Sequence, residues 1–397
     1  MGKLPHLEWL IEPTRASNSI RMEQCVSTMQ PLNKNGIIEI PQPPSMAKPR
    51  SAHPLSMSTD LIALDIGGAN IKAADGLGWV ESKSFELWRH FQKLPAVIEH
   101  FLSDARPRRV VATMTGEIAD CYQSRQAGVQ HIITSLQSAV HAFDRDAEPE
   151  IYLVDGSIVS PEVALGCPLH AAGCNWHAVA RLAASYCQTD KAFLIDIGST
   201  TTDIVAILNH APAPLACNDL GRMSVGELVY TGIERTPIAS IVRSLPLHGS
   251  LHPVASELFA QSRDVWLLLG ELDEQPFANE TADGGPVTRE AARVRMARML
   301  LADPDDVSID QAAGAAEWCA AAQSRQVARA LSRVSRGIGW QPTSVIVSGH
   351  GECLARRALQ HIGWNAKIVS LPDQLGSDVS RVAPAHALAM IARGLLV

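Results

Sequence analysis

One nine-residue pattern occurs twice in the chain and constrains the fold more than any other feature of the sequence. Residues 64–72 read Leu-Asp-Ile-Gly-Gly-Ala-Asn-Ile-Lys, and residues 195–203 read Ile-Asp-Ile-Gly-Ser-Thr-Thr-Thr-Asp. Each copy consists of an apolar strand, an Asp, an apolar residue, a Gly, a small polar turn and the start of a second strand. Two copies about 130 residues apart indicate two related domains that face each other across a cleft.

Short apolar strands alternate with Ala-rich helical segments from Asp60 onward. Strands are predicted at 61–66, 110–114, 151–154, 192–197, 202–208 and 345–347, and helices at 175–185, within 287–335, and from about 384 to 396. This alternation indicates an α/β fold with open sheets. We predict a first domain at 58–190, completed by the C-terminal helix 384–397. A second domain at 191–383 carries a helical insertion at about 231–335.

Residues 1–57 differ in composition from the rest of the chain. They contain a Pro-rich stretch and no sustained periodicity, so a mostly disordered extension is predicted. Nothing in the first 30 residues has the pattern of a signal peptide, because no continuous apolar segment precedes a small-residue cleavage site.

Composition limits the classes of partner. Apolar residues make up 46% of the 397 residues, charged residues 19%, and the formal net charge is −7. These values are typical of a globular protein and argue against a nucleic-acid binder, because no broad basic surface is implied. No uncharged apolar stretch approaches the roughly 18 residues of a membrane-spanning helix. We therefore expect a cytoplasmic protein with no membrane partner; the sequence leaves open whether it is a homo-oligomer.

The two turns have the chemistry of a phosphate site. A glycine after the Asp lets backbone N–H groups approach an anion, and hydroxyl groups add further donors. The predicted phosphate contacts at the turns are Gly67, Gly68, Gly198, Ser199, Thr200 and Thr201. An ordinary hairpin explains a single Asp-x-Gly turn, whereas two matched copies favour phosphate binding.

Two carboxylates at a phosphate site require a compensating cation. Asp65 and Asp196 would repel phosphate unless a divalent ion lies between them. Mg²⁺ binds through one or two carboxylates plus phosphate and water, so we predict magnesium held by Asp65 and Asp196. Lys72 would add a positive charge at the first turn. No Cys-x-x-Cys pair is present, and zinc is not expected.

The two turns resemble the phosphate loops of the actin, sugar kinase and Hsp70 superfamily. Residues 348–352, Ser-Gly-His-Gly-Glu, are similar to its third loop, which meets adenosine in members that use ATP. The resemblance implies two facing actin-like ATPase (ribonuclease H-like) domains. It adds Gly349 and Gly351 to the predicted phosphate-binding residues.

A narrower resemblance covers nearly all of residues 60–397. The strings at 113–122, 175–178, 196–203, 226–232, 235–237, 264–270 and 281–284 are similar to the hydantoinase A and oxoprolinase branch. Within that branch they resemble the enzymes of methanofuran-type cofactor biosynthesis, relatives of tetrahydromethanopterin-linked C1-transfer proteins. This implies a transferase that joins the phenol of γ-glutamyltyramine to an aminomethylfuran methyl diphosphate, forming an ether and releasing diphosphate.

Two alternatives remain on the same fold. One is an ATP-dependent enzyme, either a small-molecule kinase or an amidohydrolase that opens a lactam or hydantoin. The other is a nucleotide switch without enzymatic activity, although this length leaves no evident room for a peptide-binding domain.

Glu117 and Asp120 are the candidate acid–base residues. Their i, i+3 spacing after the strand at 110–114 would place both carboxylates on one side of a short helix. They could deprotonate the phenol, whose unperturbed pKa is about 10, bind a second metal or bind the aminomethyl group. Acidic residues that favour a helix N-terminus are an equally good explanation.

Asn175, Trp176 and His177 open a predicted helix. Asn175 is most simply its N-cap. Trp176 could stack on an aromatic substrate, although a buried tryptophan usually belongs to the core. His177 is a weaker candidate for a general base.

Glu227, Arg235 and Arg289 lie beyond the second turn and are the remaining predicted substrate-binding residues. An arginine suits a bidentate contact with diphosphate or with glutamyl carboxylates. Surface or interdomain salt bridges explain these residues equally well.

Overall fold

The computed structural model describes residues 59–396, so the extension predicted at 1–57 lies outside the described residues. The first sheet has the strand order β3-β2-β1-β4-β5-β6. Its strands are β1 (Leu61–Ile66), β2 (Asn70–Ala74), β3 (Val80–Ser84), β4 (Arg109–Met114), β5 (Glu150–Tyr152) and β6 (Ile158–Val159).

The second sheet has the order β10-β8-β7-β13-β14, with β9 paired to β8. Its strands are β7 (Lys191–Ile197), β8 (Thr202–Leu208), β9 (Ala211–Pro212), β10 (Leu228–Val229), β13 (Ser344–Gly349) and β14 (Lys367–Ser370). A separate hairpin joins β11 (Ser244–Leu247) to β12 (Ser250–Pro253).

The two sheets repeat the same core arrangement, which confirms the α/β fold with two actin-like halves. β1 pairs antiparallel with β2 and parallel with β4, as β7 does with β8 and β13. Asp65 lies opposite Lys72 in the first sheet, and Asp196 lies opposite Asp203 in the second. The duplicated sequence pattern is therefore a duplicated structure, with Lys72 and Asp203 at equivalent positions.

The repeat extends to the loops that follow β4 and β13, where the sequence alone had not suggested it. The N–H of Gly116 donates to the carbonyl of Ile66 at 3.0 Å, and the N–H of Gly351 donates to Ile197 at 3.2 Å. The two acceptors occupy the same place in the two turns. Glu117 and Glu352, each one residue later, are therefore structural counterparts.

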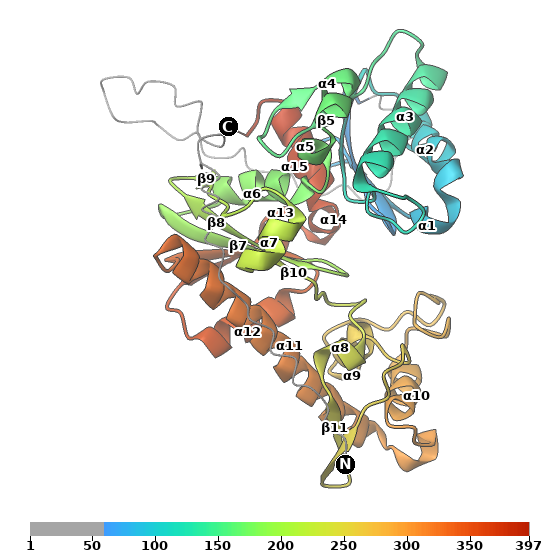
Figure 1. Ribbon diagram of the computed structural model, residues 1–397, viewed down its shortest axis with the longest axis vertical. Coiled ribbons are helices and arrows are strands. Elements are labelled where there is room, and N and C mark those ends of the chain that lie inside the picture. Colours follow the sequence, from blue (N-terminus) through green and yellow to red (C-terminus); the bar gives the residue numbers. More distant parts are fainter. Residues whose placement is uncertain (1–58, 397) are drawn as a thin grey trace, which may run out of the picture. The chain divides into compact units, whose positions relative to one another are not determined.

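Helices flank both sheets, and the helices within residues 238–299 lie apart from the sheets, against the long helix at 309–338 (Figure 1). The helices are α1 (Leu87–His90), α2 (Leu94–Ala105), α3 (Arg125–Phe143), α4 (Pro161–Gly166), α5 (Pro168–Ala171), α6 (Asn175–Ser185), α7 (Asp219–Val225), α8 (Ile238–Ile241), α9 (Ser262–Leu268), α10 (Arg289–Met299), α11 (Ile309–Ile338), α12 (Glu352–Ile362), α13 (Leu371–Leu375), α14 (Ser377–Arg381) and α15 (Ala383–Ala392). α2 lies beside α3 on the first sheet, and α11 lies beside α12 on the second (Figure 1). Within residues 59–396, no helix combines the length and apolarity that would carry it across a bilayer.

A shared apolar core joins the halves. α6 and α15 pack against each other, and α15 also contacts β1, β2 and β4. The same buried cluster contains side chains of β1, such as Leu61 and Ala63, and of β7, such as Ala192 and Leu194. Burial of this apolar surface stabilises the connection between the sheets that carry the two turns.

Two predicted helical stretches have different limits in the structure. The stretch within 287–335 is divided into α10 and α11 by a short 3₁₀ turn at Pro304–Asp306. The C-terminal helix ends at Ala392, because Gly394 adopts a positive φ of 69°.

Candidate functional site

Both turns are closed by the same hydrogen bond. The N–H of Gly67 donates to the carbonyl of Asn70 at 3.0 Å, and the N–H of Gly198 donates to Thr201 at 3.0 Å. A Cβ at Gly67 would lie 2.8 Å from the Asn70 carbonyl oxygen, so a side chain there would open the turn. A Cβ at Gly68 would meet nothing within 4 Å, and this residue borders open space.

Donor groups at the turns are available to an anion. Within the described part of the chain, no hydrogen bond uses the backbone N–H of Gly68, Ser199 or Thr200. The hydroxyl groups of Ser199 and Thr200 lie 3.4 Å apart and are half-buried. N–H and O–H donors of this kind suit phosphate oxygens. Thr202, by contrast, is buried and donates its hydroxyl to the carbonyl of Thr231 at 2.7 Å, a structural contact.

The segment 231–235 packs directly on the second turn. The N–H of Ile233 donates to the carbonyl of Gly198 at 3.0 Å, and the N–H groups of Glu234 and Arg235 both donate to Ser199, at 3.1 and 2.9 Å. Because these bonds use the carbonyl side of the turn, its N–H side stays available.

Gly232 allows this close approach. A Cβ at Gly232 would lie 2.5 Å from the carbonyl carbon and oxygen of Ser199. From α11, the Gln323 side chain holds the segment by donating to the Thr231 hydroxyl at 2.9 Å and the Gly232 carbonyl at 2.8 Å.

Substitution of Gly232 by Ala should displace the second turn, because the clash is with backbone atoms. We expect Gly232→Ala to lower both the melting temperature and turnover. Gly314→Ala is the matched control: Gly314 is exposed within α11, and its Cβ would meet nothing within 4 Å. Loss of helical glycine should stabilise the control by about 0.5–1 kcal/mol in a denaturant titration. A Gly232→Ala protein as stable and active as the wild type would contradict the role of Gly232 in the close packing of residues 231–235 on the second turn.

Asp65 is buried at the end of β1, and its Oδ1 atom has no hydrogen-bond partner among the described residues. Burial raises the pKa of Asp65 above its usual range, while the charge of Lys72 and hydrogen bonding from Asn175 oppose the rise. Asn175 thus serves Asp65 and is not the N-cap of α6. The N-cap position belongs to Cys174, one residue earlier.

Asp196 occupies the same place in the second turn. Burial, together with the neighbouring charge of Asp203, raises the pKa of Asp196 to about 6, and the charge of Lys72 opposes the rise. Lys72 therefore acts on the carboxylates of both turns. Directly opposed residues of an antiparallel pair have Cβ atoms roughly 5 Å apart, so Asp196 and Asp203 form a close carboxylate pair.

A buried arginine holds Asp203. Arg222 is 1% exposed, and its Nη1 lies 2.8 Å from Oδ1 of Asp203. Its guanidinium carbon lies 4.0 Å from the ring centroid of Trp176, and its Nη2 donates to the carbonyl of Glu227 at 3.2 Å. Trp176 is itself buried, and Arg222 already occupies one face of its ring.

Substitution of Arg222 should lower the free energy of unfolding far more than substitution of a surface arginine. Arg222→Met would leave Asp203 buried without its counter-ion, and we expect a loss of about 3 kcal/mol of unfolding free energy in urea titrations. The control is Arg298→Met: Arg298 is 47% exposed and pairs with Asp283 at 2.8 Å. Such surface pairs contribute less than about 1 kcal/mol. Equal losses in the two variants would show that Arg222 is not a buried counter-ion.

Glu117 and Asp120 lie in a turn and not on a helix, so the prediction that they share one side of a helix is wrong. Glu117 is 1% exposed, whereas Asp120 is exposed to solvent. Oε2 of Glu117 has no hydrogen-bond partner among the described residues. Burial raises the pKa of Glu117 to about 7, with a smaller contribution from the charge of Asp65. A carboxyl group that titrates near neutral pH is suited to proton transfer.

The start of α3 fixes the position of Glu117. A Cβ at Gly128 would lie 2.1 Å from the Glu117 carbonyl oxygen, so the two backbones are in close contact. Arg125, the first residue of α3, forms a 2.9 Å ion pair with Asp219 at the start of α7. Opposite charges thus flank Glu117, since Arg125 lowers its pKa and Asp219 raises it.

His177 is held away from base chemistry. Its Nδ1 lies 2.7 Å from the hydroxyl of Tyr152, and burial lowers the pKa of His177 to about 4. The imidazole is therefore neutral at physiological pH and has a structural partner.

Two other predicted substrate contacts have structural partners. Both carboxylate oxygens of Glu227 accept backbone N–H groups, from Leu215 at 2.7 Å and Ala216 at 3.1 Å. Arg289, at the start of α10, donates to the carbonyl of Leu268 at 3.2 Å within the helical segment formed with α9. Neither residue is brought to the turns by these contacts.

The glycines of the third loop serve close packing. A Cβ at Gly349 would lie 2.2 Å from the carbonyl oxygen of Ile197, and one at Gly351 would lie 2.3 Å from the Ile197 side chain. His350, between them, places Nε2 3.3 Å from Glu234. The loop is thereby attached both to β7 and to the 231–235 segment.

Unpaired buried polar atoms gather around the turns. Within residues 59–396 they include Oδ1 of Asp65, Oε2 of Glu117, Nε1 of Trp176 and Nε of Arg222. Folded proteins rarely leave such atoms without a partner, and exceptions concentrate at functional sites. Ser380 and His386, in α14 and α15, also carry such atoms, so the four named here support this region as the site without marking it alone.

The carboxylates fit the limited demands of magnesium. Among the described residues, no group of three or more His, Cys, Asp or Glu side chains could hold a metal ion by itself. Asp65 offers an unpaired oxygen, and Asp196 lies beside Asp203. Magnesium is commonly held by one or two carboxylates and completed by phosphate and water, so this donor set fits.

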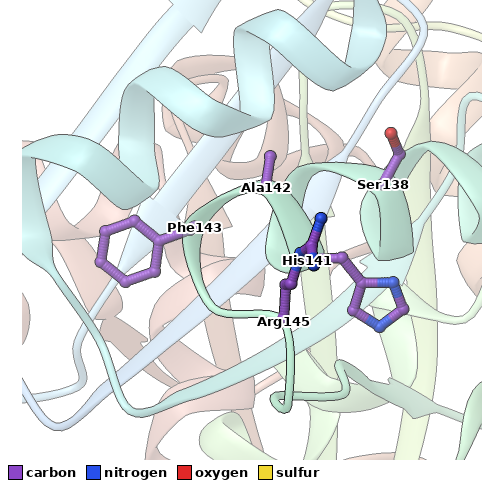
Figure 2. A pocket seen from close by; sticks show the side chains of 5 residues that line it. All are labelled: Ser138, His141, Ala142, Phe143 and Arg145. Carbon is purple, nitrogen blue, oxygen red and sulfur yellow. The ribbon is translucent and has the colours of Figure 1, made fainter.

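Two surface hollows lie elsewhere. Figure 2 shows the first, at the C-terminal end of α3, lined by Ser138, His141, Ala142, Phe143 and Arg145. Glu117 contacts Gly128 near the other end of this 19-residue helix, roughly 15 Å from Ser138 and roughly 22 Å from Phe143 at 1.5 Å per residue. The second hollow is lined by residues of α11 and α12, including Glu317 and Arg357. Neither is lined by a residue of the two turns.

Sequence reasoning missed four charged residues of the site. They are Asp203, Arg222, Arg125 and Asp219. The repeat did contain a signal for Asp203, because it aligns with Lys72 in the two nine-residue copies. Nothing local in the sequence marks the other three, whose roles arise from contacts between distant segments.

Comparison with known proteins finds a matching family model and two named relatives. A family model described as hydantoinase/oxoprolinase matches residues 108–393. A protein of Methanocaldococcus jannaschii named (4-{4-[2-(gamma-L-glutamylamino)ethyl]phenoxymethyl}furan-2-yl)methanamine synthase is 28% identical over 342 residues, covering 84% of this chain and 98% of that protein. A protein of the same name from Methanococcus vannielii is 27% identical over 208 residues, covering 52% of this chain and 92% of the relative.

Two sugar kinases are among the solved structures to which the chain is similar. The inorganic polyphosphate/ATP-glucomannokinase of Arthrobacter sp. strain KM is 15% identical with a TM-score of 0.37, covering 84% of this chain and 98% of its own. The ROK hexokinase of Thermus thermophilus is 15% identical with a TM-score of 0.36, covering 84% and 99%.

Proposed function

The chain belongs to the hydantoinase/oxoprolinase family, and from this membership and the geometry of its site we propose that it is a transferase of methanofuran-type C1-carrier biosynthesis. In this proposal it joins the phenol of γ-glutamyltyramine to an aminomethylfuran methyl diphosphate. An ether forms and diphosphate leaves. The relatives named for the corresponding product support this choice of substrates.

One observation carries the proposal: the buried carboxyl group of Glu117, whose pKa burial raises to about 7, belongs to the same charge cluster as Asp65 of the first Asp-Ile-Gly turn. The charge of Asp65 acts on Glu117, and that of Lys72 acts on both Asp65 and Asp196. A base and a cradle for a leaving anion are what displacement of diphosphate by a phenol requires.

The roles of the residues follow from this chemistry. The phenol oxygen attacks the methylene carbon of the furan substrate, its proton passes to Oε2 of Glu117, and the carbon–oxygen bond to diphosphate breaks. The N–H groups of Gly68, Ser199 and Thr200 stabilise the charge on the departing diphosphate. Magnesium bound at Asp65 or Asp196 would supply further positive charge to that anion.

An ATP-dependent reaction is the alternative, because the same donors suit the phosphates of ATP. The test is to titrate the purified protein with magnesium and ATP and, separately, with the furan diphosphate and γ-glutamyltyramine. We expect equimolar ether and diphosphate without ATP. Tight ATP binding with hydrolysis and no ether product would overturn the proposal.

A further inference from the structure

One cation–aromatic contact connects the two turns. The guanidinium carbon of Arg235 lies 5.5 Å from the ring centroid of Trp88. Trp88 belongs to α1, whose first residue, Leu87, donates its N–H to the carbonyl of Gly68 in the first turn at 3.0 Å. Arg235 donates its own N–H to the carbonyl of Ser199 in the second turn at 2.9 Å. Arg235 itself is thus hydrogen-bonded to the second turn, and the residue next to Trp88 is hydrogen-bonded to the first turn.

Arg235 differs from the neighbouring arginines in its partner. Arg222 pairs with Asp203 at 2.8 Å, and Arg263 pairs with Glu234 at 2.6 Å. Among the ion pairs formed by residues 59–396, none includes Arg235, whose side chain is exposed. Its guanidinium therefore has no carboxylate partner among the described residues, and it lies beside a turn with unused backbone N–H groups.

The face of an aromatic ring is a suitable support for an arginine that must bind phosphate. A carboxylate partner occupies the N–H edges of the guanidinium, whereas a ring contacts its flat face and leaves those edges free. A planar fork with free edges can bind two phosphate oxygens at once. Lysine cannot reproduce that geometry.

We propose that Trp88 is a positioning residue, which holds Arg235 with its donors free as the arginine that binds the diphosphate group between the two turns. This inference rests on the proposed function, because it assumes a diphosphate substrate. It adds a residue from outside the duplicated pattern and gives the predicted role of Arg235 a structural basis.

The kinetic consequence is specific. Arg235 contacts diphosphate before and during its departure, so loss of its support weakens binding of the ground state and of the transition state alike. The KM for the furan diphosphate should then rise roughly tenfold in Trp88→Leu, with kcat nearly unchanged. Trp88→Phe keeps an aromatic face and should restore most of the affinity.

Calorimetric titration of the full chain with inorganic pyrophosphate and magnesium tests the inference without turnover. Trp88→Leu and Arg235→Ala should each weaken binding roughly tenfold, and the double variant should bind no more weakly than Arg235→Ala alone, because both changes remove one interaction. Trp318→Leu is the matched control; Trp318 is 42% exposed on α11, and its variant should bind as the wild type does.

The outcomes separate this inference from the proposed function. Wild-type affinity in Trp88→Leu, or losses that add in the double variant, would overturn the role of Trp88 while leaving the proposed function intact. A wild-type protein that binds neither pyrophosphate nor the furan diphosphate would overturn both. If Trp88→Leu has a lowered melting temperature, the comparison of Arg235→Ala and Arg235→Lys in the Trp88→Phe protein decides. Equal affinity in those two and the Trp88→Phe parent would contradict the role of Arg235.

Discussion

Asp196→Asn should abolish ether formation and leave the protein folded. The substitution keeps the size and shape of the side chain but removes the charge at the second turn. Loss of a preorganised charged group at a reacting centre typically lowers kcat by about 10²–10³-fold. If Asp196 also holds magnesium, diphosphate binding should fall with turnover, which pyrophosphate titration would measure directly.

The fold should tolerate this change because the charge is not a source of stability. Burial and Asp203 raise the pKa of Asp196 to about 6 from its ordinary 3.8, so the folded state holds the proton more tightly than the unfolded state. The contribution of Asp196 to the free energy of unfolding therefore falls as pH rises from about 4 through 6. Asp196→Asn removes that dependence. At pH 8 we expect a melting temperature at or above that of the wild type.

Asp190→Asn is the control for Asp196→Asn. The Asp190 side chain is 78% exposed just before β7, so its variant should keep wild-type turnover and stability. Unchanged turnover in Asp196→Asn would remove the central role given to the second turn.

The duplicated turns could be predicted because their information is local. Strand, Asp, Gly and small turn follow one another within nine residues, and the same short-range forces shape both copies. The fold class follows from this repeat and from the alternation of strands and helices. The second pair of loops escaped notice because Thr-Gly-Glu at 115–117 and His-Gly-Glu at 350–352 share only two residues, and their equivalence depends on sheet register.

Site residues that depend on tertiary contacts could not be read from the sequence. The i, i+3 spacing of Glu117 and Asp120 fits a helix and a turn equally well. The structure forms a turn that buries one carboxylate and exposes the other. Asn175 has the residue type of an N-cap, yet the helix starts one position earlier and its side chain serves Asp65. Arg222 contacts Asp203 and Trp176 only because the fold brings α6, α7 and β8 together.

Glu117→Gln should remove the acid limb of the pH–rate profile. A general base must be deprotonated, so wild-type kcat/KM should rise with pH and level off above about 7, the pKa to which burial raises Glu117. Gln cannot accept the proton, and we expect a loss of about 10²–10⁴-fold in kcat, typical of a missing acid–base group. The measurement is ether formation between pH 5 and 9.

Glu352→Gln is the matched control for Glu117→Gln, because Glu352 occupies the equivalent position in the other half. Its carboxylate already accepts hydrogen bonds from Nε of Arg356 at 2.7 Å and from the Ser370 hydroxyl at 2.6 Å. It therefore has no free oxygen comparable to Oε2 of Glu117, and its variant should keep an acid limb near pH 7. If the acid limb survives in Glu117→Gln but disappears in Glu352→Gln, the base is Glu352 in the second half, and the role given to Glu117 is wrong.

Stability gives an independent reading of the same carboxyl group. Because the pKa of Glu117 is raised from 4.5 to about 7, native stability should fall as pH rises through that interval and be lowest above pH 7. Glu117→Gln should lack this decline, so its melting temperature relative to the wild type should increase between pH 5 and pH 8. If Glu117→Gln changes neither turnover nor the pH dependence of the melting temperature, Glu117 is not the base that deprotonates the phenol. The charged groups at the two turns, Asp65, Lys72 and Asp196, would then serve phosphate binding alone.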